Sequence, residues 1–375
     1  MDRIVLAYSG GLETSAAISW LAGKYRAEVV TLTLDVGQGS TLDDVRERAL
    51  AIGAVRAHVL DAREDLARRF VLPALQAGAI GHGGDPLAAA LTRPLIARKL
   101  VEIAHIEGAK AVAHGDHRFG SAPGAIDRSV AAIDPAIKVI PLAQAWGQSR
   151  AQLIPYAKER GIPIPPNVDR SYHTDANLWG RSIQCGLLVD AWQDVPEDLF
   201  ATAKSADDAP DRPAFVEIQF EHGEPVKLNS IAMSLVELIQ SLETIAGAHA
   251  IGRADRLDGS VEGAASREIY DAPAATVLAM AHQDLQQVVT EPDLQRLSAD
   301  LGVTYADLVR HGQWDTRTRE AIDALVANVQ RQVTGAVRLK LYKGDCRVAG
   351  RRAAGEVRST KLEVRSRKAT EATSR

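Results

Sequence analysis

Residues 4–15 read IVLAYSGGLETS, a short apolar run that stops at a Ser-Gly-Gly turn and continues into a helix-like segment. The run from Ile4 to Tyr8 predicts a strand that is buried on both faces. From Thr14 to Leu21 the apolar residues recur at helical spacing. A buried strand followed directly by a glycine turn and a helix is typical of a parallel α/β sheet.

The same alternation of strand and helix continues as far as residue 115. Further strands are expected at Ala27 to Leu34, Ala57 to Leu60 and Ala111 to His114. Helices are expected at Thr41 to Ile52, with Ser40 or Thr41 as N-cap, and at 87–107. Such alternation predicts right-handed crossovers between parallel strands. We therefore expect a doubly wound, parallel-sheet α/β domain.

The Ser-Gly-Gly turn has the composition of an anion-binding loop. Gly10 and Gly11 permit positive φ and a close approach of the backbone to a ligand. The helix that follows directs free N–H groups and its positive dipole end at the loop, and Ser9, Thr14 and Ser15 add hydroxyl groups. The lysine of a Walker A loop is absent. The turn predicts a pyrophosphate cradle, although plain strand–helix corners use similar residues.

A second domain is expected after the breaker-rich segment 161–167, which reads GIPIPPN. Phe215 to Phe220 alternates like a half-exposed strand, and Pro225 to Leu228 is expected to pair with it. Further helices are expected near 231–247, 274–290 and 316–333, and a further strand at Val337 to Tyr342. The predicted organisation is a nucleotide-binding domain at 1–165, an α+β domain at 166–350 and a basic, flexible tail at 351–375. The tail has eight basic and three acidic residues.

Composition narrows the class of protein further. The 375 residues are 46% hydrophobic and 25% charged, which suffices for an ordinary core. The net charge of −4 argues against a nucleic-acid partner. The two cysteines, Cys185 and Cys346, form no metal or disulfide pattern. No apolar run spans a membrane and the N-terminus has no signal-peptide pattern, so we expect a cytoplasmic protein without a membrane partner.

Residues 7–15, AYSGGLETS, resemble the AYSGGLDTS signature of the argininosuccinate synthase family, within the PP-loop ATP pyrophosphatases. Similar segments follow in family order up to about residue 352. They are Arg93 to Ala97, Ala113 to Gly115, Asn177 to Ser182, Ile245 to Gly247, Gly252 to Asp255, Ser266–Arg267 with Tyr270, Val333 to Gly335 and Arg338 to Gly344. The family's closing Ser-Leu-Tyr and long C-terminal helix are absent.

The resemblance implies an AMP-forming carbon–nitrogen ligase. In that family ATP adenylates the ureido oxygen of citrulline, and the amine of aspartate then displaces AMP. On this chain the implied ATP site comprises Ala7, Tyr8, Ser9, Gly10, Gly11, Leu12, Glu13, Thr14, Ser15, Leu34 and Gly115. Glu13 stands for the family's aspartate and keeps its charge. Mg²⁺ is expected to travel with the nucleotide, no catalytic side chain is assigned, and a homotetramer or homodimer is implied.

The implied amino-acid site departs from the family. The aligned binding positions are Asp85, His117, Ser121, His173, Ser182, Asp258 and Tyr270, of which only Ser182 and Tyr270 keep the family residue. Ala90, Ala122 and Ala125 replace a serine, an aspartate and an arginine. Each lost charge-assisted hydrogen bond is worth about 1.5–3 kcal/mol. We therefore expect amino-acid-like substrates other than citrulline and aspartate.

Three alternatives stay open at this stage. The first is an authentic argininosuccinate synthase of arginine biosynthesis with a rebuilt substrate loop. The second is a sulfur-transfer or RNA-modifying PP-loop enzyme, for which Cys185 would be the candidate cysteine. The third is a non-catalytic, ATP-binding paralogue. Resemblance along most of the chain weighs against the second, and retained ATP binding without turnover would identify the third.

Overall fold

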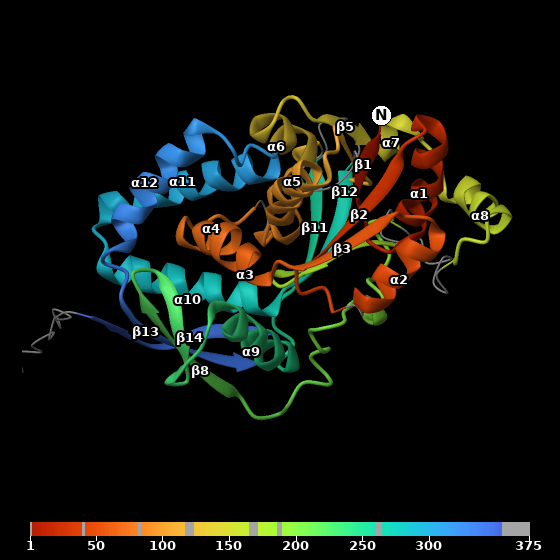
Figure 1. Ribbon diagram of the computed structural model, residues 1–375. Coiled ribbons are helices and arrows are strands. Elements are labelled where there is room, and N and C mark those ends of the chain that lie inside the picture. The colour runs from red at the N-terminus through yellow and green to blue at the C-terminus, as the bar shows by residue number, and fades with distance from the viewer. Residues whose placement is uncertain are drawn as a thin grey trace, which may run out of the picture.

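The computed structural model describes residues 2–39, 42–81, 84–116, 124–164, 172–185, 190–259 and 265–354. Positions 150, 185, 258–259 and 265–266 are described by their backbone alone. His117, Ser121 and the expected N-cap at Ser40 or Thr41 lie outside the described residues, as does the side chain of Asp258. Figure 1 shows strands β1 (Arg3–Ala7), β2 (Glu28–Asp35) and β3 (Arg56–Asp61) of the parallel sheet on one side of the molecule. The antiparallel strands β8 (Ala214–Glu221), β13 (Gly335–Tyr342) and β14 (Asp345–Ala353) lie on the other.

The first half alternates strands and helices. Its elements are β1 (Arg3–Ala7), α1 (Leu12–Tyr25), β2 (Glu28–Asp35), α2 (Leu42–Ile52), β3 (Arg56–Asp61), α3 (Arg63–Leu66), η1 (Ala67–Val71), α4 (Leu72–Gln76), α5 (Ala88–Glu107), β4 (Ala111–His114), α6 (Ala125–Ile133), β5 (Lys138–Pro141), α7 (Leu142–Ala145) and α8 (Arg150–Glu159). The five strands form one parallel sheet in the order β3-β2-β1-β4-β5. The predicted strands, the parallel sheet and its class are confirmed.

Both faces of this sheet are covered, which explains the uninterrupted apolar strands. Ile4 and Leu6 of β1 pack with Ile18 of α1 on one face. Val5 points the other way and belongs to the core that includes Leu95 of α5. Alternate side chains of one strand therefore enter two separate cores, as period-two geometry requires. The sheet is doubly wound, and its carboxyl edge lies at the ends of β1, β2 and β4.

The second half is α+β, as predicted. Its elements are β6 (Tyr172–Asn177), β7 (Gly180–Cys185), η4 (Glu197–Leu199), β8 (Ala214–Glu221), β9 (Glu224–Leu228), β10 (Ile231–Ala232), α9 (Leu235–Ala248), β11 (Arg253–Gly259), β12 (Ala265–Asp271), α10 (Pro273–Val289), α11 (Pro292–Arg310), α12 (Arg317–Gln330), β13 (Gly335–Tyr342) and β14 (Asp345–Ala353). It contains two antiparallel sheets, ordered β10-β9-β8-β13-β14 and β11-β12-β7-β6. The expected pairing of β8 with β9 is confirmed.

The five-stranded antiparallel sheet carries the second half's core. Val216, Ile218 and Phe220 of β8 are buried at every second position, and β13 repeats the pattern with Val337, Leu339 and Leu341. These side chains join one core with residues of α9 and α10, and α10 lies beside β13 and β14 in Figure 1. Strand β14 continues to Ala353, so Arg351 and Arg352, assigned to the tail, pair with β13.

The small sheet connects the two halves through the turn between β6 and β7. Leu178 donates its backbone N–H to the carbonyl of Val36 at 2.6 Å, just beyond β2. The Asn177 amide donates to the carbonyl of Ala88 at 2.7 Å, at the start of α5. These bonds hold β6 against the carboxyl edge of the parallel sheet. Residues of the second half therefore stand beside the glycine turn of the first.

Candidate functional site

The glycine turn has the geometry of a strand-to-helix cradle. Gly10 has φ +77°, and a Cβ there would lie 3.2 Å from Val45 Cγ2. Gly11 has φ −74° and ψ 167° as the N-cap of α1, and no side chain caps the helix. Only one of the two glycines therefore needs the left-handed conformation. The uncapped first turn leaves N–H groups directed toward an incoming anion.

The hydroxyl groups of the turn divide into two sets. Ser9 Oγ lies 3.1 Å from Thr14 Oγ1, and both residues line the cavity beside the turn. Ser15 is fully buried and its Oγ lies 3.0 Å from the Tyr8 hydroxyl, so it supports the loop from within. Arg48 of α2 donates to the carbonyl of Gly10 at 2.9 Å. Arg48 could not be predicted as part of the site, because no local sequence pattern links α2 to the turn.

A cavity of about 450 Å³ opens at this edge of the sheet. Of the predicted nucleotide-binding residues, Ala7, Tyr8, Ser9, Thr14, Leu34 and Gly115 line it, whereas Gly10, Gly11, Leu12, Glu13 and Ser15 do not. Its opposite wall includes residues 173–176 of β6, among them the predicted substrate residue His173. One hollow therefore joins the glycine turn to the second half of the chain.

An arginine between two aspartates forms part of this wall. Arg93 of α5 has its Nε 2.8 Å from Asp116 Oδ1 and its Nη2 2.8 Å from Asp175 Oδ2. Burial acts to lower the pKa of Arg93, but the carboxylates of Asp175 and Asp116 outweigh it and raise that pKa. Arg93 is therefore charged at any working pH. Residues 93–97 carry part of the family resemblance, but the sequence alone indicates no role for Arg93.

His114, the last residue of β4, also lines the cavity. Its Nε2 lies 3.3 Å from Asp127 Oδ2, and its Nδ1 accepts the backbone N–H of Asp116 at 3.2 Å. Burial acts to raise the pKa of Asp127, but its interaction with His114 prevails and lowers that pKa. His114 thus holds both the Asp127 side chain and the backbone of Asp116, which lines the cavity.

Two other predicted substrate residues meet in a separate buried cluster. Asp85, only 1% exposed, accepts the Leu87 backbone N–H at 2.7 Å and pairs with Arg310 at 2.5 Å. The Tyr270 hydroxyl donates to Glu268 at 2.8 Å. Burial raises the pKa of Tyr270, and the negative charges of Asp85 and Glu268 raise it further. Asp85 is therefore held by an ion pair from α11, a contact that sequence analysis did not foresee.

Ser182 and His173 belong to the small sheet that supports this cluster. Ser182 is buried and lies opposite Tyr270 in the β7–β12 register. It also lies opposite Asp175, in the pairing of β6 with β7. The sheet therefore brings Ser182, Tyr270 and the Arg93–Asp175 pair into one neighbourhood. His173 lies two residues before Asp175 and reaches the cavity directly.

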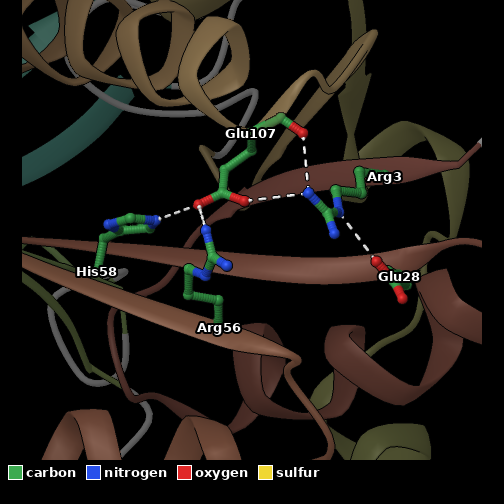
Figure 2. Close-up of polar contacts among 5 residues, drawn as sticks. All are labelled: Arg3, Glu28, Arg56, His58 and Glu107. Carbon is green, nitrogen blue, oxygen red and sulfur yellow. Dashed lines mark hydrogen bonds and ion pairs between the residues drawn. The ribbon is translucent and has the colours of Figure 1, made fainter.

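A third charged cluster lies at the opposite edge of the parallel sheet, near the start of its strands (Figure 2). The Glu107 side chain is 1% exposed and its Oε1 lies 2.7 Å from Arg56 Nη1 and 2.8 Å from His58 Nε2. Its Oε2 lies 3.4 Å from Arg3, which also pairs with Glu28. Burial acts to raise the pKa of Glu107, but His58 and Arg56 prevail and lower it. The cluster ties the end of α5 to β1 and β3.

Within the residues that the structure describes, no group of three or more His, Cys, Asp and Glu side chains is arranged to hold a metal ion. Among those same residues no helix has both the length and the apolar character needed to cross a bilayer.

The doubly wound sheet, the uncapped glycine turn and the cavity at the strands' carboxyl edge define a nucleotide-binding protein of the PP-loop type. Two family models match the chain. The model described as "Arginosuccinate synthase N-terminal HUP domain" matches residues 3–163, and the "Arginosuccinate synthase C-terminal domain" matches residues 172–372. The chain belongs to the argininosuccinate synthase family, whose members are ATP-using, AMP-forming carbon–nitrogen ligases.

Curated relatives agree with this assignment. An argininosuccinate synthase of Oceanobacillus iheyensis is 44% identical over 93% of this chain and 84% of its own length. One of Symbiobacterium thermophilum is 45% identical over 93% of this chain and 87% of its own. A third, of Brevibacillus brevis, is 44% identical over 96% and 86%. The resemblance found in the sequence is confirmed along most of the chain.

Proposed function

We propose that the chain catalyses the argininosuccinate synthase reaction, in which ATP activates citrulline for attack by the amine of aspartate, releasing AMP and pyrophosphate. The observation that carries the proposal is the single cavity that joins the glycine turn to His173 and Asp175 of the second half. A nucleotide and an amino acid bound there would lie side by side. Proximity of this kind accounts for much of the rate in reactions without a covalent enzyme intermediate.

The residues of the turn suit the phosphate chain of a nucleotide, which would bring its own Mg²⁺. The left-handed Gly10 and the free N–H groups of α1 fit a phosphate chain, and Ser9 and Thr14 offer hydroxyl donors from the cavity wall. Leu34 and Gly115 line the same hollow. ATP would supply the leaving group, while these groups would hold it and stabilise the charge on the departing phosphates.

The comparisons favour citrulline and aspartate over the altered substrates expected from the sequence. Three relatives that are 44–45% identical over at least 93% of the chain are named argininosuccinate synthase. A substrate pair other than citrulline and aspartate stays as a second candidate function because of one observation. Asp85 is engaged by Arg310 in a buried ion pair, so a residue expected at a substrate headgroup has a protein partner instead.

Steady-state kinetics with ATP, citrulline and aspartate tests the proposal. We expect AMP and pyrophosphate to form with a kcat/KM of roughly 10⁴ M⁻¹s⁻¹ or more. Pyrophosphate release only with another ureido, amide or carboxylate acceptor and another amine would favour the second candidate. ATP binding without turnover on any pair would identify a non-catalytic paralogue.

Assembly, location and domain division belong to the same proposal. We propose a homodimer or homotetramer in the cytoplasm, with a nucleotide domain at 1–165 and a synthetase domain that starts at 166 and includes β14 as far as Ala353. The two family models meet between residues 163 and 172, which supports a boundary there. Light scattering at micromolar concentration tests the assembly, and a monomeric mass would refute it.

A further inference from the structure

One buried carboxylate oxygen in the cavity wall has no hydrogen-bond partner. Asp116 follows Gly115 at the carboxyl end of β4, and its side chain is 5% exposed. Its Oδ1 faces Arg93, whereas Oδ2 has no donor within the part of the chain that the structure describes. An acceptor removed from water without a donor is costly and therefore uncommon in a native protein. The cavity, which Asp116 lines, is where a donor would arrive.

The charge around this oxygen points to a cation. Arg93 carries one positive charge, and its partners Asp116 and Asp175 carry two negative charges. These three side chains therefore sum to one negative charge, beside the turn proposed to hold a triphosphate. Two anionic groups close together repel each other unless a positive group lies between them. A ligand with both a positive and a negative end would satisfy both sides.

The chemistry of the wall favours an ammonium group over a metal ion held by the protein. The described residues offer no group of three metal-ligating side chains, so a metal ion held by protein groups alone is not indicated. Mg²⁺ that travels with ATP needs only one or two carboxylates, and the Mg²⁺ requirement measured below separates that occupant from an ammonium group. An ammonium donates three hydrogen bonds and needs no fixed coordination polyhedron. Asp116 Oδ2 would accept one of the three. Because Arg93 occupies Oδ1, the carboxylate is already oriented before the ligand binds.

We propose that Asp116 binds the α-ammonium group of an amino-acid substrate through Oδ2 and thereby selects amino acids over their hydroxy or deamino analogues. The inference rests on the proposed function, because it assigns a specificity residue to that same cavity. Arg93 is the positioning residue, since it acts by holding the Asp116 carboxylate. Both citrulline and aspartate carry this group, so the experiment has an arm for each.

Steady-state kinetics of the Asp116→Asn variant show which of the two amino acids Asp116 binds. The variant keeps the shape of the side chain and removes its charge. We expect the KM of one amino acid to rise about 10- to 100-fold, the loss of one charge-assisted bond. The KM values of ATP and of the other amino acid, and the Mg²⁺ requirement, should change less than about threefold. Asp134→Asn, which removes a carboxylate paired with His105 on another surface, serves as the matched control.

Analogues without an ammonium group distinguish recognition from a general structural effect. Malate replaces aspartate, and 5-ureidopentanoate replaces citrulline. The inhibition constant of the analogue matching the affected substrate should stay within about threefold in the variant. Equal weakening of substrate and analogue, a shifted Mg²⁺ requirement, or unchanged KM values for both amino acids would each overturn the inference.

Binding measurements keep the inference separate from the proposed function. If the wild type forms no AMP from citrulline and aspartate, the proposed function is wrong. Isothermal titration calorimetry can still measure whether Asp116 binds an amino acid. Each amino acid is then titrated into protein saturated with a non-hydrolysable ATP analogue. Amino-acid binding by the wild type that is lost in Asp116→Asn supports the inference. Equal binding by both proteins, or none by the wild type, overturns it.

Discussion

Replacing Glu107 by glutamine should destabilise the first half of the molecule without touching the cavity. Glu107 Oε1 accepts from both Arg56 and His58, at 2.7 and 2.8 Å, and the carboxylate is 1% exposed (Figure 2). A glutamine keeps one acceptor but turns an NH₂ group toward cationic donors. A hydrogen bond to a charged group contributes about 1.5–3 kcal/mol.

The exposure of the partners reduces this figure. The Arg56 side chain is 58% exposed and that of Arg3 is 37% exposed, so water screens both and reduces what each contributes. We therefore expect Glu107→Gln to lower the free energy of unfolding by about 2 kcal/mol at pH 7. The pKa of Glu107 is lowered by folding. Its stabilisation is thus complete above the ordinary carboxyl pKa of about 4.5 and is lost as pH falls through the lower folded value.

Equilibrium urea denaturation followed by tryptophan fluorescence measures the effect. Trp20 and Trp146 stack with ring centroids 5.0 Å apart and report on the first half. Glu102→Gln is the matched control, since Glu102 lies on the same helix but is 53% exposed. It should change stability by less than about 0.5 kcal/mol. The reasoning is refuted if Glu107→Gln matches this control at pH 7, or if its deficit persists unchanged at pH 3.

Three further outcomes are expected. Gly10→Val should weaken ATP binding at least about tenfold in calorimetry, because φ is +77° and a Cβ would crowd Val45; unchanged affinity would contradict a nucleotide role for the turn. Asp85→Asn should lower the unfolding free energy by about 3 kcal/mol, since it removes the buried carboxylate of the Asp85–Arg310 ion pair, and Asp85→Asn with Arg310→Met should recover most of it. Burial raises the pKa of Glu243 to about 7, so the folded state binds this proton more tightly and stability falls between about pH 4.5 and 7. Glu243→Gln should therefore melt higher than wild type at pH 8 but not at pH 5, and parallel melting curves would disprove this.

The strands of the parallel sheet could be predicted because burial on both faces leaves an uninterrupted apolar run. Ile4 to Tyr8 and Ala111 to His114 carry that signal in the sequence itself. Strands β6 and β11, by contrast, read YHTDAN and RADRLDG. Their side chains serve the cavity and ion pairs instead of an apolar core, so neither period-two nor period-3.6 patterning marks them. Helix α11 was missed because its buried residues gather in its last turns, from Gly302 to Val309.

The nucleotide end of the site could be predicted because its residues are contiguous. Residues 7–15 form one turn, and their chemistry follows from glycines, hydroxyls and a helix start. The polar partners come from elsewhere: Arg93 meets Asp116 and Asp175, and Asp85 meets Arg310, 225 residues away. Nothing in a single sequence pairs residues at such separations, because the contact depends on how β6 and α11 fold back on α5.

The strand order also determines which sheet can form first while the chain is being synthesised. The parallel sheet has all five of its strands once the ribosome has passed Pro141. Strand β8 must wait for its neighbour β13, which begins about 115 residues after β8 ends, at Gly335. At about 5–20 residues per second this delay is roughly 6–23 s. During it β8, with Val216, Ile218 and Phe220, has β9 on one side but lacks β13 on the other. A nascent chain held at that stage would present a natural substrate for chaperones, whereas the first half could already be native.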